Sequence, residues 1–326
     1  MQSLTVALIG ANGQIGNFIL HELLASREAQ FHVLAFIRPN SQLKYRGPQE
    51  NVTVHDTDIS KVTADSLAPY FRGADVVVSA VGAELLSRQN VLQDAAAIAD
   101  VRRFYPSEFG MHSVLRMRTE EATLIHPTWA QKMKCLDEAM KHPAVVSGRM
   151  SYTVIGCSDS FDAPGEILLC PWEDPNAMEY NMYAVGDANA KMDFTSMRTT
   201  AAYLVASICR PEISENRFLA FSGDFISIAE VADLLRSHSG KKVSVHEIPW
   251  EQAEDIIRNP SLAPPELVKA SNFPVDFLIA LRHVQGSGTM WRAPGQTHNS
   301  LFPNVKHQSV VEYFSYLFGK LGDSGP

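Results

Sequence analysis

The sequence predicts an α/β fold built on a doubly wound parallel sheet. Over the first 156 residues, short apolar runs alternate with segments that have helical periodicity. The glycine-rich stretch GANGQIG joins the first apolar run directly to the first helical segment. Strand, helix and strand at this spacing form βαβ units, and such units produce parallel sheets covered by helices on both faces.

The individual elements are expected from their period and from the turn residues between them. Six apolar runs are expected to form strands, at residues 4–9, 32–37, 52–56, 74–81, 102–107 and 152–156. Amphipathic helices are expected at 15–26, 90–100 and 309–319. Ser227 and Glu230 form a capping box for a further helix, which Gly240 can end. Residues 161–187 and 284–304 lack a clean period, and we expect irregular pocket walls there.

Composition and charge argue against several classes of function. The 326 residues include 28 basic and 36 acidic side chains, with a formal net charge of −8 and no basic run, which disfavours nucleic-acid binding. No signal peptide and no membrane-spanning stretch is recognisable, so we expect a cytoplasmic protein without membrane contact. The spacing of the four cysteines fits neither a zinc site nor a disulfide framework, and we expect buried thiols and no metal.

The stretch GANGQIG predicts a dinucleotide site of the Rossmann type. Gly10, Gly13 and Gly16 stand where the first strand meets the first helix. Glycines there let the backbone turn sharply and approach a pyrophosphate at the helix N-terminus. The spacing GxxGxxG is characteristic of extended and atypical short-chain dehydrogenases. The cofactor contacts predicted in this loop are Gly10, Asn12, Gly13, Gln14, Ile15 and Gly16.

The end of the second strand predicts which nucleotide is bound. An NAD site carries an acidic residue there for the ribose hydroxyls, whereas this strand ends in Arg38, with Lys44 close behind. A guanidinium group suits a 2′-phosphate, so the predicted cofactor is NADPH, bound in part by Arg38 and Lys44. The alternative is that Arg38 is an ordinary solvated loop charge.

A longer motif resembles a known family. RRFYPSEFG at 102–110 is similar to the RFxPSEFG segment of isoflavone reductases, phenylcoumaran benzylic ether reductases and their NmrA-like relatives, which are atypical short-chain dehydrogenases/reductases. Three further segments agree with that family in order and spacing: GADVVVSAVG at 73–82, GDANAK at 186–191 and FPNVKHQSVVEYF at 302–314. The resemblance therefore covers nearly the whole chain.

This resemblance implies a domain organisation and a reaction. It implies an NADP-binding Rossmann domain at 1–156 and a smaller, partly interleaved α+β substrate-binding domain mainly at 157–326, with some segments returning to the first domain. It also implies NADPH-dependent hydride transfer to a small, aromatic or conjugated metabolite such as a ketone, enone or quinone methide. The family's acid/base lysine falls on Lys132.

Helical phase separates Lys132 from its neighbour Lys134 by an independent argument. At about 100° per residue, an apolar stripe centred near 0° is formed by Trp129, Met133, Leu136 and Met140. Lys132 lies at about 300°, on the flank of this stripe, whereas Lys134 lies at about 140° among solvated charges. We therefore predict Lys132 at the edge of a cleft. The alternative is a lysine whose stem only covers the core.

Further candidates lie at the ends of the later strands. The remaining predicted cofactor contacts are Ser79, Val81, Ser107, Lys132, Cys157 and Ser158, the last two through a main chain that could bind the carboxamide. Glu108 is expected to shape the loop. His112, His126 and His283 could assist proton transfer, although a structural role is favoured for each.

Two alternatives to a reductase stay open at this stage. An NmrA-like regulator would bind NADP without catalysis and would not need Lys132, and a non-redox isomerase or lyase could use Lys132 with the nucleotide as a scaffold. Thr128 stands four residues before Lys132, so the Tyr-x-x-x-Lys pair of ordinary short-chain dehydrogenases is missing. The expected partner is a small-molecule substrate, and the chain is expected to be a monomer or a homodimer.

Overall fold

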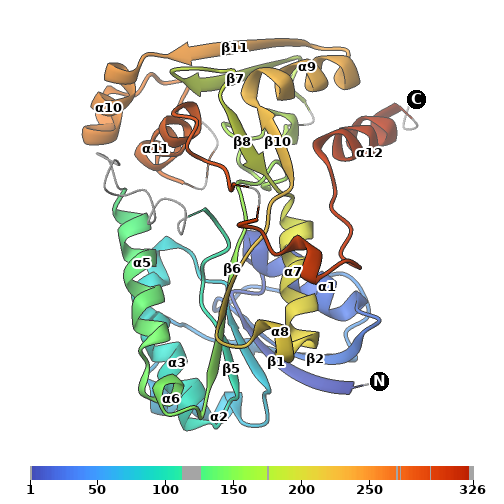
Figure 1. Ribbon diagram of the computed structural model, residues 1–326, viewed down its shortest axis with the longest axis vertical. Helices are drawn as coiled ribbons and strands as arrows, with labels where there is room; N and C mark the ends of the chain where they lie inside the picture. Colours follow the sequence, from blue (N-terminus) through green and yellow to red (C-terminus); the bar gives the residue numbers. More distant parts are fainter. Residues whose placement is uncertain are drawn as a thin grey trace.

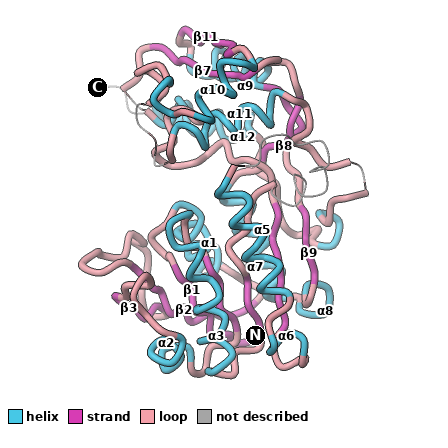
Figure 2. The backbone as a smooth tube through the Cα atoms, turned by 90° about the vertical axis from the view of Figure 1, so that its left-hand side faces the viewer, coloured by secondary structure: helices cyan, strands magenta, loops and turns pink. Residues whose placement is uncertain are grey.

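The chain folds into two lobes, which lie one above the other in Figure 1. The computed structural model describes residues 2–111, 126–174, 176–268, 271, 273–293 and 295–322. The first lobe is built on a seven-stranded sheet, and the second lobe contains two two-stranded sheets. Figure 2 shows the lobes from the side, with β7 and β11 at the top and α2, α3 and α6 at the foot.

The sheet of the first lobe is parallel throughout. Its strands are β1 (Gln2–Ile9), β2 (Ala29–Ile37), β3 (Val52–Asp56), β4 (Val76–Ser79), β5 (Arg103–Tyr105), β6 (Ser151–Gly156) and β9 (Arg217–Ala220). Their order is β3-β2-β1-β4-β5-β6-β9. Strands β2 and β3 are added on one side of β1 and strands β4 to β6 on the other, as in a Rossmann fold. The six expected strands are confirmed, and β9 returns to this sheet from the second half of the chain.

Helices cover both faces of this sheet because its strands are apolar on both sides. One face packs against α1 (Gln14–Ala25) and α7 (Met197–Cys209) through residues such as Leu8 and Leu20. The other packs against α2 (Ala64–Phe71), α3 (Gln89–Ile98) and α5 (Pro127–Met140) through Ile9 and Leu92. Each such fully buried side chain contributes about 1.5–3 kcal/mol. The short helices α6 (Pro143–Val146) and α8 (Pro211–Ser214) lie in the same lobe.

In the described residues, the second lobe combines two small sheets with four α-helices. β7 (Glu179–Val185) pairs in parallel with β11 (Lys242–Ile248), and β8 (Lys191–Phe194) pairs antiparallel with β10 (Asp224–Ser227). Its helices are α9 (Ile228–Ser239), α10 (Trp250–Arg258), α11 (Val275–Gly286) and α12 (Val310–Gly322). The predicted capping box of Ser227 and Glu230 is present, and Gly240 ends α9 in the left-handed region at φ 66°.

Two expectations about loops need correction. Residues 161–187 were expected to be irregular, but they include the 3-10 helix η2 (Pro171–Glu173) and the whole of β7. Only part of β7 alternates between buried and exposed positions, and its partner β11 lies far along the chain, so the local pattern did not predict the strand. Residues 284–304 likewise contain the end of α11 and the 3-10 helix η4 (Asn299–Leu301).

Arg292 connects several of the segments that pass between the lobes. Its guanidinium group donates to the carbonyl of Cys157, just after β6, at 3.0 Å and to that of Phe221, just after β9, at 2.8 Å. Its main-chain N–H donates to the Asp193 carboxylate in β8 at 2.9 Å. Arg292 therefore joins two strand ends of the first lobe through its side chain and β8 of the second lobe through its main chain.

Among the described residues, no helix is both long and apolar enough to span a membrane.

Candidate functional site

The glycine loop has the close backbone contacts that the sequence pattern predicts. Gly10 lies in the left-handed region at φ 85°, and a Cβ there would stand 2.6 Å from the Ala80 carbonyl oxygen. A Cβ on Gly16 would stand 2.0 Å from the Gly10 carbonyl oxygen. Gly13 is the N-cap of α1, and no described side chain caps this helix. The loop thus leaves a compact cradle at an open helix N-terminus, which fits a pyrophosphate.

Asn12 fastens this loop to the segment that follows β2. Its side-chain NH₂ group donates to the Gln42 carbonyl at 2.8 Å, and its side-chain oxygen accepts from the Lys44 N–H at the same distance. Both ends of the amide are therefore used within the protein, so Asn12 acts on the loop's shape.

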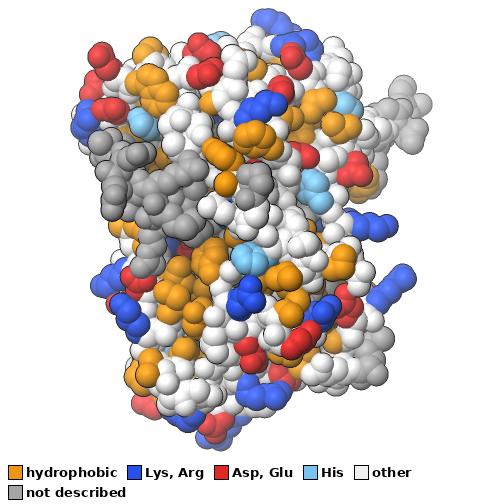
Figure 3. Space-filling view, viewed as in Figure 1, with side chains coloured by type: hydrophobic (Ala, Val, Ile, Leu, Met, Phe, Trp, Pro, Cys, Tyr) orange, Lys and Arg blue, Asp and Glu red, His pale blue; other side chains and the backbone are white. Residues whose placement is uncertain are grey.

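The cations that were predicted to select the cofactor are available to a ligand. Arg38 follows β2 directly, Lys44 lies in the segment held by Asn12, and both side chains are exposed. Neither forms an ion pair within the described part of the chain. On the face shown in Figure 3, basic and acidic side chains are interspersed and form no continuous basic surface. Arg38 and Lys44 therefore suit a single phosphate group better than a nucleic-acid backbone.

Gln14 links the glycine loop to a segment beyond β6. Its side-chain NH₂ group donates to the Pro164 carbonyl at 2.8 Å and to the carboxylate of the buried Glu166 at 3.0 Å. Ile15 packs against the core of the first lobe. Among the predicted loop residues, Gln14 and Ile15 thus have contacts that hold the loop in place.

A continuous line of contacts runs along the carboxyl edge of the sheet. The loop after β1 touches the loop after β4 where Gly10 meets Ala80. The hydroxyl of Ser107, after β5, donates to the Val81 carbonyl, after β4, at 2.8 Å. The next residue, Glu108, accepts from the ammonium group of Lys132 through its carbonyl at 2.7 Å. The cradle for a pyrophosphate and the predicted acid/base lysine thus belong to one edge of the sheet.

The loop that holds Lys132 is itself well fixed. The Ser107 N–H donates to the Gln89 side chain at 2.7 Å, and the Phe109 N–H donates to the Ile155 carbonyl in β6 at 2.8 Å. Phe109 lies in the left-handed region at φ 61°, which a non-glycine residue adopts only where the surroundings stabilise it. Ser79, at the end of β4, is fully buried, and its hydroxyl has no hydrogen-bond partner among the described residues.

Lys132 and Lys134 have different environments, as the helical phase predicted. Lys134 is exposed, and its ammonium group lies 3.9 Å from the Glu138 carboxylate. Lys132 is partly buried, and burial lowers the pKa of its ammonium group, whereas nearby Glu108 and Cys135 act in the opposite direction. A lysine with a lowered pKa gives up its proton more readily than an ordinary one.

The position of Lys132 relative to the buried face differs from the prediction in one respect. The buried residues of α5 are Trp129, Cys135, Leu136 and Ala139, whereas Met133 and Met140 are only partly buried. On the same angular scale this face centres near 300° rather than 0°. Lys132 therefore lies in the middle of the buried face, because α5 packs against α3 and the 3-10 helix η1 (Ala83–Arg88) through its smaller side chains.

After β6, both main-chain groups of Cys157 bond within the protein. The Cys157 N–H donates to the Phe109 carbonyl at 3.3 Å, and its carbonyl accepts from Arg292. Its N–H is therefore withheld from a nicotinamide carboxamide. The thiol faces the core, where burial raises the pKa to about 11. The Ser158 hydroxyl pairs with that of Thr195, so both predicted contacts help to connect the lobes.

The candidate histidines have structural partners where the structure describes them. Nδ1 of His126 accepts from the Thr128 N–H at 3.2 Å, and its Nε2 lies 3.2 Å from the Asp276 carboxylate. His283 lies against the Trp250 ring, and burial lowers the pKa of its imidazole. His112 is outside the described residues.

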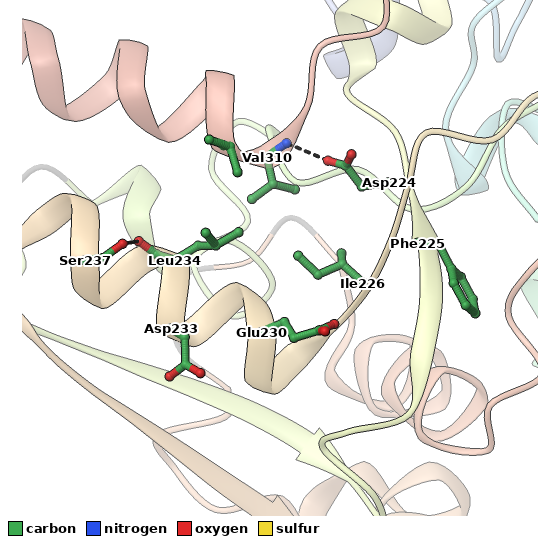
Figure 4. Close-up of a pocket in the computed structure, with 9 residues that line it drawn as sticks. Asp224, Phe225, Ile226, Glu230, Asp233, Leu234, Ser237 and Val310 are labelled. Atoms are coloured by element: carbon green, nitrogen blue, oxygen red, sulfur yellow. Dashed lines mark hydrogen bonds between the residues drawn. The ribbon is translucent and has the colours of Figure 1, made fainter.

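A separate cavity of about 590 Å³ lies in the second lobe, between β10, α9 and α12 (Figure 4). Its lining combines apolar residues with Asp224, Glu230 and Asp233. The acidic groups are already engaged: Asp224 accepts from the Val310 N–H at 2.6 Å, Glu230 pairs with Lys191 and Asp233 with Arg236. The lining includes none of the predicted site residues, so this cavity is separate from the candidate active site.

Comparison with known proteins decides the family. The family model described as "NmrA-like family" matches residues 2–277. The chain belongs to the NmrA-like family.

Proteins similar to this NmrA-like chain include plant reductases. The chain is 24% identical to isoflavone reductase homolog P3 of Arabidopsis thaliana, over 96% of this chain and 97% of that protein. It is also 24% identical to phenylcoumaran benzylic ether reductase POP1 of Populus trichocarpa, over 94% and 97% of the two chains. The fold resembles the binary complex of leucoanthocyanidin reductase with NADPH from Vitis vinifera, with a TM-score of 0.71, 19% identity and coverage of 97% and 99%.

Sequence reasoning missed several residues that shape the site of this NmrA-like protein. Gln89 fixes the Ser107 main chain, Arg292 joins the strand ends, and Asp276 pairs with His126. Their partners lie 18 or more residues away in sequence, so no local period could reveal them. The only local signal was for Arg292, which lies in a long stretch without clean period.

Proposed function

We propose that this protein is an NADPH-dependent reductase that transfers a hydride to a small aromatic or conjugated metabolite, with Lys132 as the acid/base residue. The observation that carries the proposal is the line of contacts from Gly10 through Ala80, Val81 and Ser107 to Glu108 and Lys132. A cofactor in this cradle and a proton donor at Lys132 would lie along one edge of the Rossmann sheet, where such folds bind their ligands. Relatives named as reductases support the same class of reaction.

Residues of the first lobe would hold the cofactor. The glycine loop and the open N-terminus of α1 would bind the pyrophosphate, and Arg38 with Lys44 would bind the 2′-phosphate. The buried Ser79 hydroxyl, which lacks a described partner, offers a further polar contact at the end of β4. When bound, NADPH supplies the hydride. We propose that residues 1–156 with β9 and α7 form this cofactor domain and that the second lobe contributes most of the substrate contacts.

Lys132 would supply the proton. Its ammonium group is held by the Glu108 carbonyl, and a lowered pKa makes it a better acid toward a substrate oxygen that gains negative charge. In the deprotonated form it could instead take a phenolic proton and promote the loss of a leaving group. Because Thr128 occupies the place of a tyrosine four residues earlier, this proton transfer would rest on the lysine alone.

The decisive experiment compares two lysine variants that lie on opposite sides of one helix. Lys132→Met should lower turnover by roughly 10²–10⁴-fold, the usual contribution of a general acid, while NADPH still binds. Lys134→Met is the matched control and should keep wild-type turnover, since Lys134 is exposed. NADPH absorbance would be followed with panels of enones, aromatic ketones and benzylic ethers, and NADPH binding by fluorescence titration.

The outcomes separate the remaining hypotheses. NADPH oxidation that depends on Lys132 supports the reductase. Conversion of substrate without oxidation of NADPH would indicate an isomerase or lyase that uses the same lysine. Tight NADPH binding without any conversion would indicate a regulator, and equal activity of Lys132→Met and Lys134→Met would remove Lys132 from the mechanism.

A further inference from the structure

Helix α5, which carries Lys132, lies between two His-Pro pairs of the same construction. His126 and Pro127 begin α5, and His142 and Pro143 begin the next helix, α6. In each pair the proline occupies the first helical position, where its missing N–H is not needed. The imidazole Nδ1 then accepts from the following residue's N–H, that of Thr128 at 3.2 Å and that of Ala144 at 3.1 Å.

This capping leaves the other ring nitrogen free to connect two helices. Since Nδ1 acts as an acceptor, the neutral ring carries its proton on Nε2. Nε2 of His126 lies 3.2 Å from the carboxylate of Asp276, in the first turn of α11. Nε2 of His142 lies 3.0 Å from the carboxylate of Asp94 in α3. The start of α5 is therefore tied to the second lobe, and the end of α5 is tied to the first.

The two His–Asp contacts, which tie α5 to the two lobes, differ in how well they are shielded from water. The His126 side chain is 7% exposed and that of Asp276 is 26% exposed, whereas Asp94 is 55% exposed. The His126 ring also packs edge-on against the Phe277 ring of α11, with the ring centres 5.2 Å apart. Trp129 packs against the Phe277 ring as well, at 5.7 Å. The tie to the second lobe thus combines a shielded polar bond with aromatic contacts, and it is expected to be the stronger one.

Lys132 is close enough to this tie to depend on it. It follows His126 by six residues, about 9 Å along the helix axis. Its ammonium group donates a hydrogen bond to the Glu108 carbonyl, which belongs to the first lobe. A shift of about 1 Å at the start of α5 would move the ammonium group relative to the second lobe, and misplacements of that size lower catalytic rates by about 10²-fold.

We propose that His126 is a positioning residue for Lys132: by bonding to Asp276 it fixes the start of α5 against the second lobe and holds the lysine ammonium group where the two lobes meet. This inference rests on the proposed function for its catalytic consequence, but the placement of Lys132 can be measured without it. His142 fixes the far end of the same helix and has no such effect on Lys132.

The test compares His126→Asn with His142→Asn. Asparagine is a good N-cap, so each variant keeps the capped helix and loses the bond to the other helix. In His126→Asn we expect kcat to fall by about 10–100-fold. The dissociation constant of NADPH should stay within about twofold of the wild-type value, because the cofactor residues are untouched. In His142→Asn both quantities should stay close to wild type. Asp276→Ala should reproduce the His126→Asn effect, and the double variant should show no further loss.

A second readout does not depend on activity. Acetylation of Lys132 by acetic anhydride, followed by mass spectrometry from pH 6 to 10, reports how accessible and how basic its amine is. In His126→Asn the acetylation midpoint should move toward that of an ordinary lysine, whereas in His142→Asn it should not move. If the wild type reduces no carbonyl compound, the proposed function fails and this midpoint still tests His126. Equal losses of kcat in both histidine variants, or an unmoved midpoint in His126→Asn, would overturn the positioning role.

Discussion

Asp162 offers a test in which the structure supplies both the sign and the magnitude. Its carboxylate is buried beside the start of α7 and accepts from the Met197 N–H at 2.7 Å. Burial raises its pKa from the ordinary 3.8 to about 7, the nearby Glu173 adds to this effect, and the main-chain N–H groups at the start of α7 oppose it. We therefore expect Asp162 to bind a proton near neutral pH in the native state.

The sign of the effect on stability follows from proton binding. Between about pH 4 and pH 7 the native state binds a proton that the unfolded chain has released, so the free energy of unfolding falls as the pH rises. Above the native pKa both states are ionised and the loss stays constant. The difference between 3.8 and about 7 corresponds to a total loss on the order of 4 kcal/mol, since a pKa difference of one is worth about 1.4 kcal/mol.

The perturbation is Asp162→Asn, which keeps an oxygen for the Met197 N–H and removes the ionisation. Urea unfolding followed by tryptophan fluorescence would give the free energy of unfolding of both proteins at several pH values. The variant's advantage over the wild type should grow by roughly 2–3 kcal/mol between pH 5 and 8, and then level off. A constant offset from imperfect hydrogen bonding does not affect this slope. An advantage that stays flat or shrinks with rising pH would show that Asp162 is ionised in the native protein.

Three further predictions concern the glycine loop and the segment after β2. Arg38→Asp should weaken NADPH binding by roughly 10–100-fold, the worth of a charged hydrogen bond, and spare NADH; unchanged affinity for both, by fluorescence titration, would contradict the 2′-phosphate assignment. Gly16→Ala should abolish NADPH binding, because its Cβ would stand 2.0 Å from the Gly10 oxygen, whereas the open Gly319 in α12 should accept alanine; binding retained by Gly16→Ala would refute the cradle. Asn12→Ala should lower the free energy of unfolding by about 1–2 kcal/mol, because two hydrogen bonds are lost. An unchanged thermal unfolding temperature would contradict this.

The sequence predicts the first lobe well because its signals are local. The strands and glycine turn of a parallel sheet show their period within a few residues, and β1 to β6 lie where expected. The different environments of Lys132 and Lys134 were also predictable, since helical phase separates two lysines that lie only two positions apart. The phase placed Lys132 on the flank because Met133 and Met140 were counted as core and Cys135 and Ala139 were not.

The second lobe and the supports of the site were less predictable. β7 pairs with β11, and His126 pairs with Asp276 150 residues away, so these partners meet only when the chain has folded. Asn12, Gln14 and Cys157 were predicted as cofactor contacts, yet their side chains or main chain bind other parts of the protein. In a single sequence, a residue that contacts a ligand cannot be told from a neighbouring residue that only supports the site.

The buried guanidinium of Arg292 has a consequence for how the two lobes move. Burial lowers its pKa, and Asp193, Cys157 and Glu108 favour its charged form. If the strand ends after β6 and β9 separated, this cation and the carbonyls of Cys157 and Phe221 would lose their partners together. Leaving a buried charge uncompensated costs about 3–5 kcal/mol. The strand ends after β6 and β9 are therefore expected to stay together while ligands bind and leave, and any movement of the lobes is expected to occur around Arg292, whose main-chain N–H also bonds Asp193 of β8.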